Sequence, residues 1–411
     1  MKLAIKCAGA LTLLAAALPD GPARADTIGA VPMTFHISQS TLNRIRRQVA
    51  DHRWPSSNGV EPWQYGMDGA WLRNLGKIWS TTYDWRKAEA RINRFHNYFA
   101  VVEGKKLHFI VEKGSGDHPV PLLLLHGWPY SFYSFIDVIE PLAHPERFGG
   151  DAKDAFDVVV ISVPGIGLSE APDRPENLRA FGHRYDTLMA DVLHYPKYIV
   201  YGGDQGAISA SWMAHDFPDH VIGHHIHMVL PNEPDEPKDP SPAEVEFEKH
   251  FQAVRRAQHA YISTHISRGE TLASALADNP VGQAAWILDK WYWWTDRSKR
   301  PFADIYSPER LLDEVMVYVA TDSFRTSMWP YVTTNGAVVD LAPGEKIANP
   351  CGVTAWPDPG WPIPPKEAVA RSRSNIVQYT VPPRGGHFPM VEEPNLYVED
   401  LRQFRRVVVD E

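Results

Sequence analysis

The sequence predicts an α/β protein whose mostly parallel sheet carries helices on both faces. Continuous apolar runs that end in glycine or proline are typical of strands buried on both faces of a parallel sheet. Segments with a helical pattern, such as "FGHRYDTLMADVL", lie between these runs, and strands that alternate with helices indicate right-handed crossovers. Five such runs follow one another along the chain: "VPLLLLHGWP", "FDVVVISVPGIGLSE", "YPKYIVYGGDQG", "HVIGHHIHMVLPNEP" and "NIVQYTVPPRGGHFP".

The segment before these runs is rich in Trp and Arg and mostly helical in pattern. In "TLNRIRRQVADHRWP", three apolar residues recur at helical spacing: Leu42, Ile45 and Val49. Ser40 is a candidate N-cap for this helix, because a serine hydroxyl can accept a hydrogen bond from the first turn. Pro55 should end the helix, since the residue before a proline is pushed out of the helical region.

Two further segments interrupt the alternation of strands and helices. The stretch "YFAVVEGKKLHFIVEKGSG" has two β-rich runs on either side of Glu103-Gly104, which predicts a hairpin with its turn there. Residues 233–345 are mostly helical in pattern, for example in "AEVEFEKHFQAVRRAQHAYIS" and "GQAAWILDKWYWW". We interpret this interval as a helical lid inserted after the fourth buried strand.

Composition and charge exclude several classes of protein. The chain of 411 residues is 44% apolar and 22% charged, an ordinary balance for a folded protein. Its net charge of -9 argues against nucleic acid as a partner. Beyond the N-terminal segment, no apolar run is long enough to cross a bilayer. We therefore expect no transmembrane segment in the mature chain.

The N-terminus has the pattern of a secretory signal peptide, with a basic start at Lys2 and Lys6 and an apolar stretch from Cys7 to Leu18. Ala23-Arg24-Ala25 matches the small-x-small cleavage pattern, so we expect cleavage after Ala25 and a secreted or periplasmic protein. Cleavage would also remove Cys7. Only Cys351 would remain, and no intrachain disulfide could form.

The pentapeptide Gly202-Gly203-Asp204-Gln205-Gly206 fits a nucleophile elbow, a strained strand-to-helix turn with small residues on both sides of the nucleophile. Here that position holds Asp204 in place of the more usual serine. The pentapeptide alone leaves an alternative of equal weight, in which Asp204 only caps the helix that follows.

Two other segments favour the nucleophile interpretation. Enzymes with such an elbow order their machinery along the chain as nucleophile, acid and histidine, and His387 lies on a glycine loop after the last apolar run. This is the expected place for the general base. Upstream, "LHGWP" follows the first apolar run, so the backbone N–H of Trp128 can form one half of an oxyanion hole. The N–H of Gln205 can form the other half.

The chain resembles the epoxide hydrolases of the microsomal and juvenile-hormone type. The resemblance covers residues 32 to 405 in the same order and rests on "FHISQSTLNRIRRQVADHRWP", "YDWRKAEARINRF", "HGWPYSFYSFIDVIEPL", "VPGIGLSEAP", "GGDQGA", "NPVGQAAWILDKW" and "RGGHFPMVEEP". It implies an α/β-hydrolase core, an inserted helical lid and an N-terminal arm that wraps both. We therefore divide the chain into a signal peptide (1–25), an arm (26–118), a core (119–232 and 346–411) and the lid (233–345).

The resemblance also implies a mechanism that explains the carboxylate at the elbow. A carboxylate can open a strained epoxide and form an alkyl ester, whereas its attack on an ordinary ester would give a reactive anhydride. Asp204 is then the nucleophile, and His387 is the base that activates water to hydrolyse the ester. The N–H groups of Gln205 and Trp128 would hold the oxyanion of that second step.

In this family two lid tyrosines hydrogen-bond the epoxide oxygen. The first matches Tyr261. Ungapped matching places Ser327 where the family has its second tyrosine, while Tyr331 lies four residues further on. Positions four apart share a helix face, so one extra helical turn would bring Tyr331 into the site.

The acid that completes the triad of nucleophile, acid and histidine is also displaced in the sequence. The family has Glu or Asp shortly after a proline in the segment that matches "CGVTAWPDPGWP". Here Pro359 occupies the closest position in register, and Asp358 is the best candidate to orient His387, although it also suits a turn. Glu233 and Asp235, after the fourth strand, are the alternatives.

Other functions stay open on the sequence alone. His225 and His227 would share a strand face, but no carboxylate or cysteine accompanies them at a recognised spacing, so we expect no metal and no cofactor. A haloalkane-type dehalogenase on the same fold often has a tryptophan directly after the nucleophile, where this chain has Gln205. A ligand-binding relative that has lost turnover is a third interpretation. The expected substrate is a small apolar epoxide, and the sequence does not fix the oligomeric state.

Overall fold

The computed structural model describes residues 29–56, 59–229, 239–334 and 339–409. In this part of the chain a nine-stranded sheet has the order β1-β2-β3-β5-β4-β6-β7-β8-β9. The strands are β1 (Ala30–Met33), β2 (Asn97–Val102), β3 (Lys105–Glu112), β4 (Val120–Leu125), β5 (Phe156–Ile161), β6 (Tyr198–Gly202), β7 (Val221–Ile226), β8 (Cys351–Thr354) and β9 (Ile376–Thr380).

The sheet has an antiparallel edge and a parallel centre. The pairs β1–β2, β2–β3 and β3–β5 are antiparallel, and the pairs from β5 through to β9 are parallel. All five apolar runs form parallel strands, and the fold class predicted from them is confirmed. Burial on both faces was wrongly expected for the fifth run, because β9 ends the sheet and all five of its residues are only partly buried. Two strands were not predicted: β8, which joins β7 to β9, and β1, which extends the antiparallel edge.

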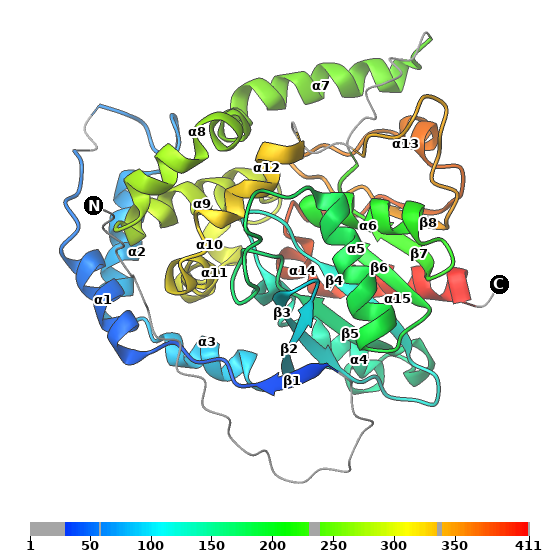
Figure 1. The fold of residues 1–411 in the computed structure, drawn as a ribbon. Coiled ribbons are helices and arrows are strands. Elements are labelled where there is room, and N and C mark those ends of the chain that lie inside the picture. The colour runs from blue at the N-terminus through cyan, green and yellow to red at the C-terminus, as the bar shows by residue number, and fades with distance from the viewer. Residues whose placement is uncertain (1–28, 57–58, 230–238, 335–338, 410–411) are drawn as a thin grey trace, which may run out of the picture.

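Helices cover both faces of the sheet (Figure 1). The helices α5 (Leu178–Thr187) and α6 (Gln205–Asp216) pack against each other, and α6 lies against β6 and β7. The helices α4 (Ile139–Ala143) and α15 (Pro394–Val409) also pack together, against β5 and β9 respectively. The short helices α13 (Lys366–Ser372) and α14 (Pro389–Glu392) flank β9 in the sequence.

Among the described residues between β7 and β8, six α-helices follow one another. They lie to one side of the sheet, at the top and left of Figure 1. They occupy the predicted lid, although residues 230–238 lie outside the described part, so the boundaries 233 and 345 stay a prediction. None of the described helices combines the length and the apolar character that a bilayer span requires. The lid helices are α7 (Pro242–Gln258), α8 (Ala260–Leu276), α9 (Pro280–Trp294), α10 (Phe302–Ile305), α11 (Pro308–Thr321) and α12 (Trp329–Thr334).

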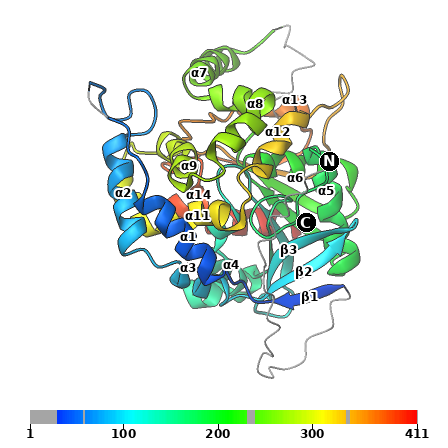
Figure 2. The ribbon, with the colours of Figure 1, turned by 60° about the vertical axis from the view of Figure 1, so that its left-hand side comes forward.

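The N-terminal helices α1 (Gln39–Ala50), α2 (Gly69–Thr81) and α3 (Trp85–Ile92) lie along the lid and the antiparallel edge (Figure 2). A buried hydrogen bond joins the arm to the lid, from the Tyr83 hydroxyl to Asp313 on α11 at 2.8 Å. Stacked rings add a second contact, between Trp63 and Tyr292 of α9, with centroids 3.6 Å apart.

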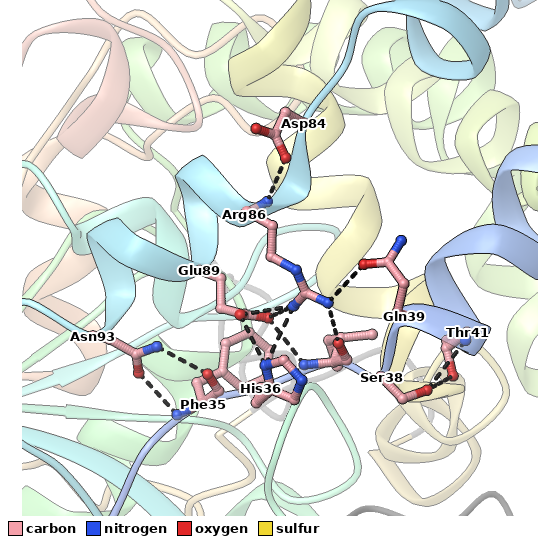
Figure 3. Close-up of polar contacts among 10 residues, drawn as sticks. Phe35, His36, Ser38, Gln39, Thr41, Asp84, Arg86, Glu89 and Asn93 are labelled. Atoms are coloured by element: carbon pink, nitrogen blue, oxygen red, sulfur yellow. Dashed lines mark hydrogen bonds and ion pairs between the residues drawn. The ribbon is translucent and has the colours of Figure 1, made fainter.

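Polar contacts fix the start of the arm to α3 (Figure 3). The Arg86 guanidinium pairs with the Glu89 carboxylate at 2.6 Å, and the same carboxylate accepts the Ile37 N–H at 3.0 Å. Asn93 bonds both backbone groups of Phe35, at 2.8 and 2.9 Å. The arm is therefore held by hydrogen bonds to the backbone as well as by its apolar face.

The local predictions for the arm have mixed outcomes. Ile45 and Val49 are buried on α1 as expected, but the N-cap prediction is wrong. Ser38 caps the helix by accepting the Thr41 N–H at 3.1 Å, because the helix starts two residues earlier than the apolar spacing suggests. The hairpin is confirmed: β2 and β3 pair around Glu103-Gly104, where both residues have positive φ (50° and 76°), as a tight hairpin turn requires.

Candidate active site

The elbow between β6 and α6 places Asp204 in a conformation that non-glycine residues seldom adopt, with φ 51° and ψ -127°. The crowding around it explains the flanking glycines. A Cβ on Gly203 would lie 1.9 Å from Cε1 of His227, and a Cβ on Gly206 would lie 2.4 Å from the Leu125 carbonyl oxygen. The Asp204 carboxylate makes no capping hydrogen bond to α6, so the alternative of a simple helix cap is wrong.

The two oxygens of the Asp204 carboxylate have different surroundings. Oδ1 accepts the Trp128 backbone N–H at 2.9 Å, and Oδ2 lies 3.6 Å from Nε2 of His387. A Cβ on Gly127 would come within 2.2 Å of Oδ1 and 2.7 Å of the Gln205 nitrogen, so these groups converge on one point. Asp204 is only 3% exposed. The structure thus brings the predicted nucleophile and both predicted oxyanion-hole residues together.

His387 lies between two carboxylates. Its Nδ1 is 2.6 Å from Oδ2 of Asp358, which sits in the loop after β8. The other Asp358 oxygen, Oδ1, accepts the N–H groups of Gly360 (2.7 Å) and Trp361 (3.0 Å), which hold the carboxylate in place. Asp358 is thus the acid that the structure places beside His387. Glu233 and Asp235 lie outside the described residues.

The charges around His387 determine its protonation. Complete burial disfavours the imidazolium, but the negative charges of Asp358 and Asp204, both close to the ring, and the hydrogen bond to Asp358 outweigh this effect and raise the pKa of His387 to about 9. The resting site therefore holds a protonated histidine between two carboxylates. Nε2 makes no hydrogen bond of standard geometry, so it is available to a water molecule.

Two lid tyrosines lie close to each other and near Asp204. Tyr261 on α8 stacks on the Trp128 ring (centroids 5.1 Å apart), and Tyr331 on α12 lies 5.8 Å from the Tyr261 ring. Burial, together with charges that include Asp204, raises the pKa of both phenols well above the usual value, so both stay protonated at neutral pH. Neither hydroxyl makes a hydrogen bond of standard geometry to another described residue.

Ser327 does not take the place of the second tyrosine. It lies in the turn before α12, where its hydroxyl donates to the Phe324 carbonyl oxygen at 2.7 Å. The next helix carries Tyr331 toward Tyr261 and Trp128, which is the outcome that one additional turn was expected to give. Pro359 is likewise not part of the triad, and its carbonyl oxygen accepts a hydrogen bond from Gln258 of the lid.

The strand histidines have protein partners. Nε2 of His225 pairs with Asp400 at 2.9 Å, and Nδ1 of His227 bonds the Tyr201 hydroxyl. His227 lies directly below Gly203 and thereby helps to shape the elbow. Sequence reasoning missed this role, because strand alternation shows which residues share a face but not what they touch.

Two further residues lie around His387, and the sequence indicated the contact of neither with this histidine. Trp294, at the end of α9, packs on the His387 ring with centroids 4.7 Å apart, and Glu392 bonds the backbone on both sides of His387. The only signal for Glu392 was an acid five residues after the histidine, in "HFPMVEEP".

The sheet order, the elbow and the histidine loop after the last strand define a hydrolase of the α/β-hydrolase fold. Residues 120–259 match the family model described as alpha/beta hydrolase fold, and residues 30–135 match the one described as epoxide hydrolase N terminus.

Proteins similar to this chain indicate which family within the α/β-hydrolase fold it belongs to. A Stigmatella aurantiaca protein with a provisional assignment as an epoxide hydrolase is 35% identical over 92% of this chain and 86% of its own length. Epoxide hydrolase 1 of Sus scrofa is 29% identical over 93% and 90%. The solved Aspergillus niger epoxide hydrolase has a TM-score of 0.80 at 26% identity, with 93% of this chain and 97% of that one covered. The chain belongs to the epoxide hydrolase family.

Proposed function

We propose that this enzyme opens a small apolar epoxide to a vicinal diol through an ester on Asp204, which water activated by His387 then hydrolyses. One observation carries the proposal. A carboxylate at a strained elbow has one oxygen bound to a backbone N–H at 2.9 Å and the other 3.6 Å from the imidazole of His387. A structural carboxylate needs neither a strained backbone nor a histidine held by a second acid.

In the first step Oδ2 of Asp204 attacks an epoxide carbon. A carbon–oxygen bond of the ring breaks, and its electron pair goes to the epoxide oxygen, which takes a proton from the phenol of Tyr261 or Tyr331. The products are a hydroxyalkyl ester and a tyrosinate. The two hydroxyls point to the same region of the buried site, so they can stabilise the charge as it develops.

Ester formation changes the state of His387. The negative charge of Asp204 disappears when the carboxylate becomes an ester, so one of the groups that raise the pKa of His387 is lost. The imidazolium can then give up its proton, which restores the tyrosine phenol. The neutral imidazole that remains, oriented by Asp358, is the base that the second step needs.

In the second step His387 takes a proton from water as the water attacks the ester carbon. The oxyanion forms at Oδ1, where the Trp128 N–H already donates and the Gln205 nitrogen is close. Collapse of the intermediate releases the diol as an alkoxide, which takes the proton from His387. The Asp204 acid then passes its own proton to His387, and the resting ion pair is restored.

The tyrosine pair favours an epoxide over a haloalkane as the substrate. A departing halide needs no proton, whereas the epoxide oxygen becomes a strongly basic alkoxide that requires a donor. Two buried phenols that stay protonated at neutral pH fit this demand. The complete arrangement of nucleophile, base and acid also supports turnover rather than simple ligand binding.

The His387→Gln variant tests the two-step reaction. Without a base the first step should proceed and the second should stall, so incubation with styrene oxide should add one epoxide mass to the intact protein. Peptide mapping should place the adduct on the peptide that contains Asp204, and Asp204→Asn should form none. An unmodified His387→Gln protein that still binds the epoxide would contradict the proposal.

We also propose that the chain is exported and cleaved after Ala25. The support is the sequence pattern of basic start, apolar stretch and Ala23-Arg24-Ala25, all of which lies outside the described residues. Sequencing of the mature N-terminus from a native host fraction should give Asp26 as the first residue. A cytoplasmic protein that retains Met1 would refute export.

A further inference from the structure

The loop that carries the base is held by four consecutive backbone N–H groups, from residues 385 to 388. The N–H groups of Gly386 and Phe388, on either side of His387, donate to the side-chain oxygens of Glu392 at 2.8 and 2.9 Å. The other two donate to the lid. The His387 N–H reaches the Trp294 carbonyl oxygen at 2.9 Å, and the Gly385 N–H reaches Oδ2 of Asp296 at 3.1 Å.

Glu392 joins these two sets of contacts. It is only 3% exposed, and its Oε2 also accepts the Asp296 N–H at 3.0 Å, so one carboxyl group binds both the loop of His387 and the lid. The approach is close. A Cβ on Gly386 would lie 2.4 Å from the Trp294 carbonyl oxygen and 2.9 Å from Oε1 of Glu392, which leaves room only for glycine.

The lid segment at this junction also packs against the catalytic groups. The Trp294 ring lies 4.7 Å from that of His387 and 5.4 Å from that of Tyr261, by ring centroids. Asp296 is held in turn by its own contacts, since its Oδ1 accepts the Ser298 N–H at 2.9 Å. The end of α9 is therefore a fixed point to which the histidine loop is attached.

We propose that Glu392 is a positioning residue for His387, and that it holds the base by tying its loop to the end of lid helix α9. This inference rests on the proposed two-step reaction. Glu392 has no contact with Asp204 or with either tyrosine among the hydrogen bonds and ion pairs of the described residues. It acts on the hydrolysis of the ester, because only that step needs the imidazole to aim a water molecule.

The rate of ester hydrolysis should depend on the exact position of the His387 ring. Nδ1 of His387 must stay 2.6 Å from Asp358 while Nε2 faces the space beside Asp204. If the N–H groups that flank His387 lose their acceptor, the loop has to move to find another, because little water reaches a side chain that is only 3% exposed. A displacement of about 1 Å at a reacting group can lower a rate by roughly 10²-fold.

Two variants test the inference from opposite sides of the junction. Glu392→Gln keeps the shape but turns an NH₂ group, which cannot accept, toward backbone donors. Asp296→Ala removes the lid acceptor for Gly385. Enzyme in excess is mixed with styrene oxide, quenched at short times, and the ester on Asp204 and the free diol are measured separately. We expect ester hydrolysis to slow by roughly 10- to 100-fold while ester formation stays within about threefold of wild type, so that the ester accumulates.

Glu393→Gln is the matched control. It makes the same change at the next residue, whose carboxylate pairs with Arg300 and Arg384 (2.6 and 2.9 Å) instead of the backbone around His387. Both steps should stay near wild type. The inference would be overturned if Glu392→Gln slowed ester formation and ester hydrolysis equally, or slowed neither. If Glu392→Gln does not fold, the same criteria apply to Asp296→Ala. Failure of wild type and His387→Gln to form any ester would instead overturn the two-step reaction itself.

Discussion

At Asp204 the chain accepts a backbone conformation that costs on the order of 1–3 kcal/mol. The cost is accepted because the positive φ of 51° turns the carboxylate away from its helix and toward the Trp128 N–H and His387. A residue with ordinary φ at this corner would present its side chain elsewhere. The strain at Asp204 and the absence of a capping hydrogen bond are thus two aspects of one feature.

The second tyrosine provides a prediction at the scale of one residue. Tyr331→Phe removes a hydroxyl that can give its proton to the epoxide oxygen, while Tyr261 remains. Loss of one donor to a developing oxyanion should slow ester formation by roughly 10- to 100-fold. Ester hydrolysis should be unchanged, because the phenol is not used there. Rapid quenching with mass analysis of the ester on Asp204 separates the two rates.

Ser327→Ala is the control for Tyr331. The Ser327 hydroxyl donates to the Phe324 carbonyl oxygen and faces its own turn. Ester formation should therefore stay near the wild-type rate. If Ser327→Ala slowed this step and Tyr331→Phe did not, the serine would be the second donor and our assignment would be wrong.

At the scale of elements, the sequence indicated the strands that are buried on both faces. A short continuous apolar run that ends in glycine or proline is typical of such a strand, so β4, β5, β6 and β7 were predictable. The same pattern located β9, but that strand ends the sheet and is only partly buried. β8 was not, because "CGVT" is four residues long and is followed by a segment rich in proline. β1 was missed for a related reason: "AVPM" contains a proline and has two exposed residues, so its pattern does not distinguish an edge strand from a loop.

The residues of the site also differ in how far the sequence predicts their positions. Glycines around Asp204 and before His387 mark turns where backbones approach closely, and that signal is visible in the sequence. Tyr331 and Asp358 were only candidates, since their positions depend on the length of a turn and on the path of a proline-rich loop. Glu392 was not predictable, because its partners are backbone N–H groups and one of them comes from the lid, almost one hundred residues away.

At the scale of the whole molecule, the arm and the core both bind the lid. The arm bonds α11 through Tyr83 and Asp313, the core holds the lid through Glu392 and Asp296, and the lid brings Tyr261 and Tyr331 over the elbow. The proposed nucleophile, base and proton donors therefore come from separate segments. Their geometry depends on the packing of the complete fold.

The ion pair at the centre of this fold has a consequence for stability. The pKa of His387 rises from 6.5 to about 9 on folding, so the folded state binds more protons than the unfolded state between these values. Stability from this group is present below pH 6.5 and is lost as the pH rises through 9, by up to ~3 kcal/mol. Between pH 6.5 and pH 9, the free energy of unfolding measured with denaturant should fall more for wild type than for His387→Gln.

The comparison of wild type with His387→Gln isolates the contribution of His387 to the pH dependence of stability. Burial raises the pKa of Glu392 to about 8, which also lowers stability with rising pH, but this group is present in both proteins. Parallel pH dependences of the two unfolding free energies would show that His387 is not held as an imidazolium in the resting site.

The covalent link between substrate and Asp204 is the central claim, and isotopic water tests it most directly. In a single turnover with enzyme in excess and H₂¹⁸O as solvent, the oxygen added to the epoxide should come from the Asp204 carboxylate. We predict an unlabelled diol and ¹⁸O in the peptide that contains Asp204. A diol that is labelled in the first turnover, with no label in the protein, would mean that water attacks the epoxide directly, and the mechanism proposed for this site would be wrong.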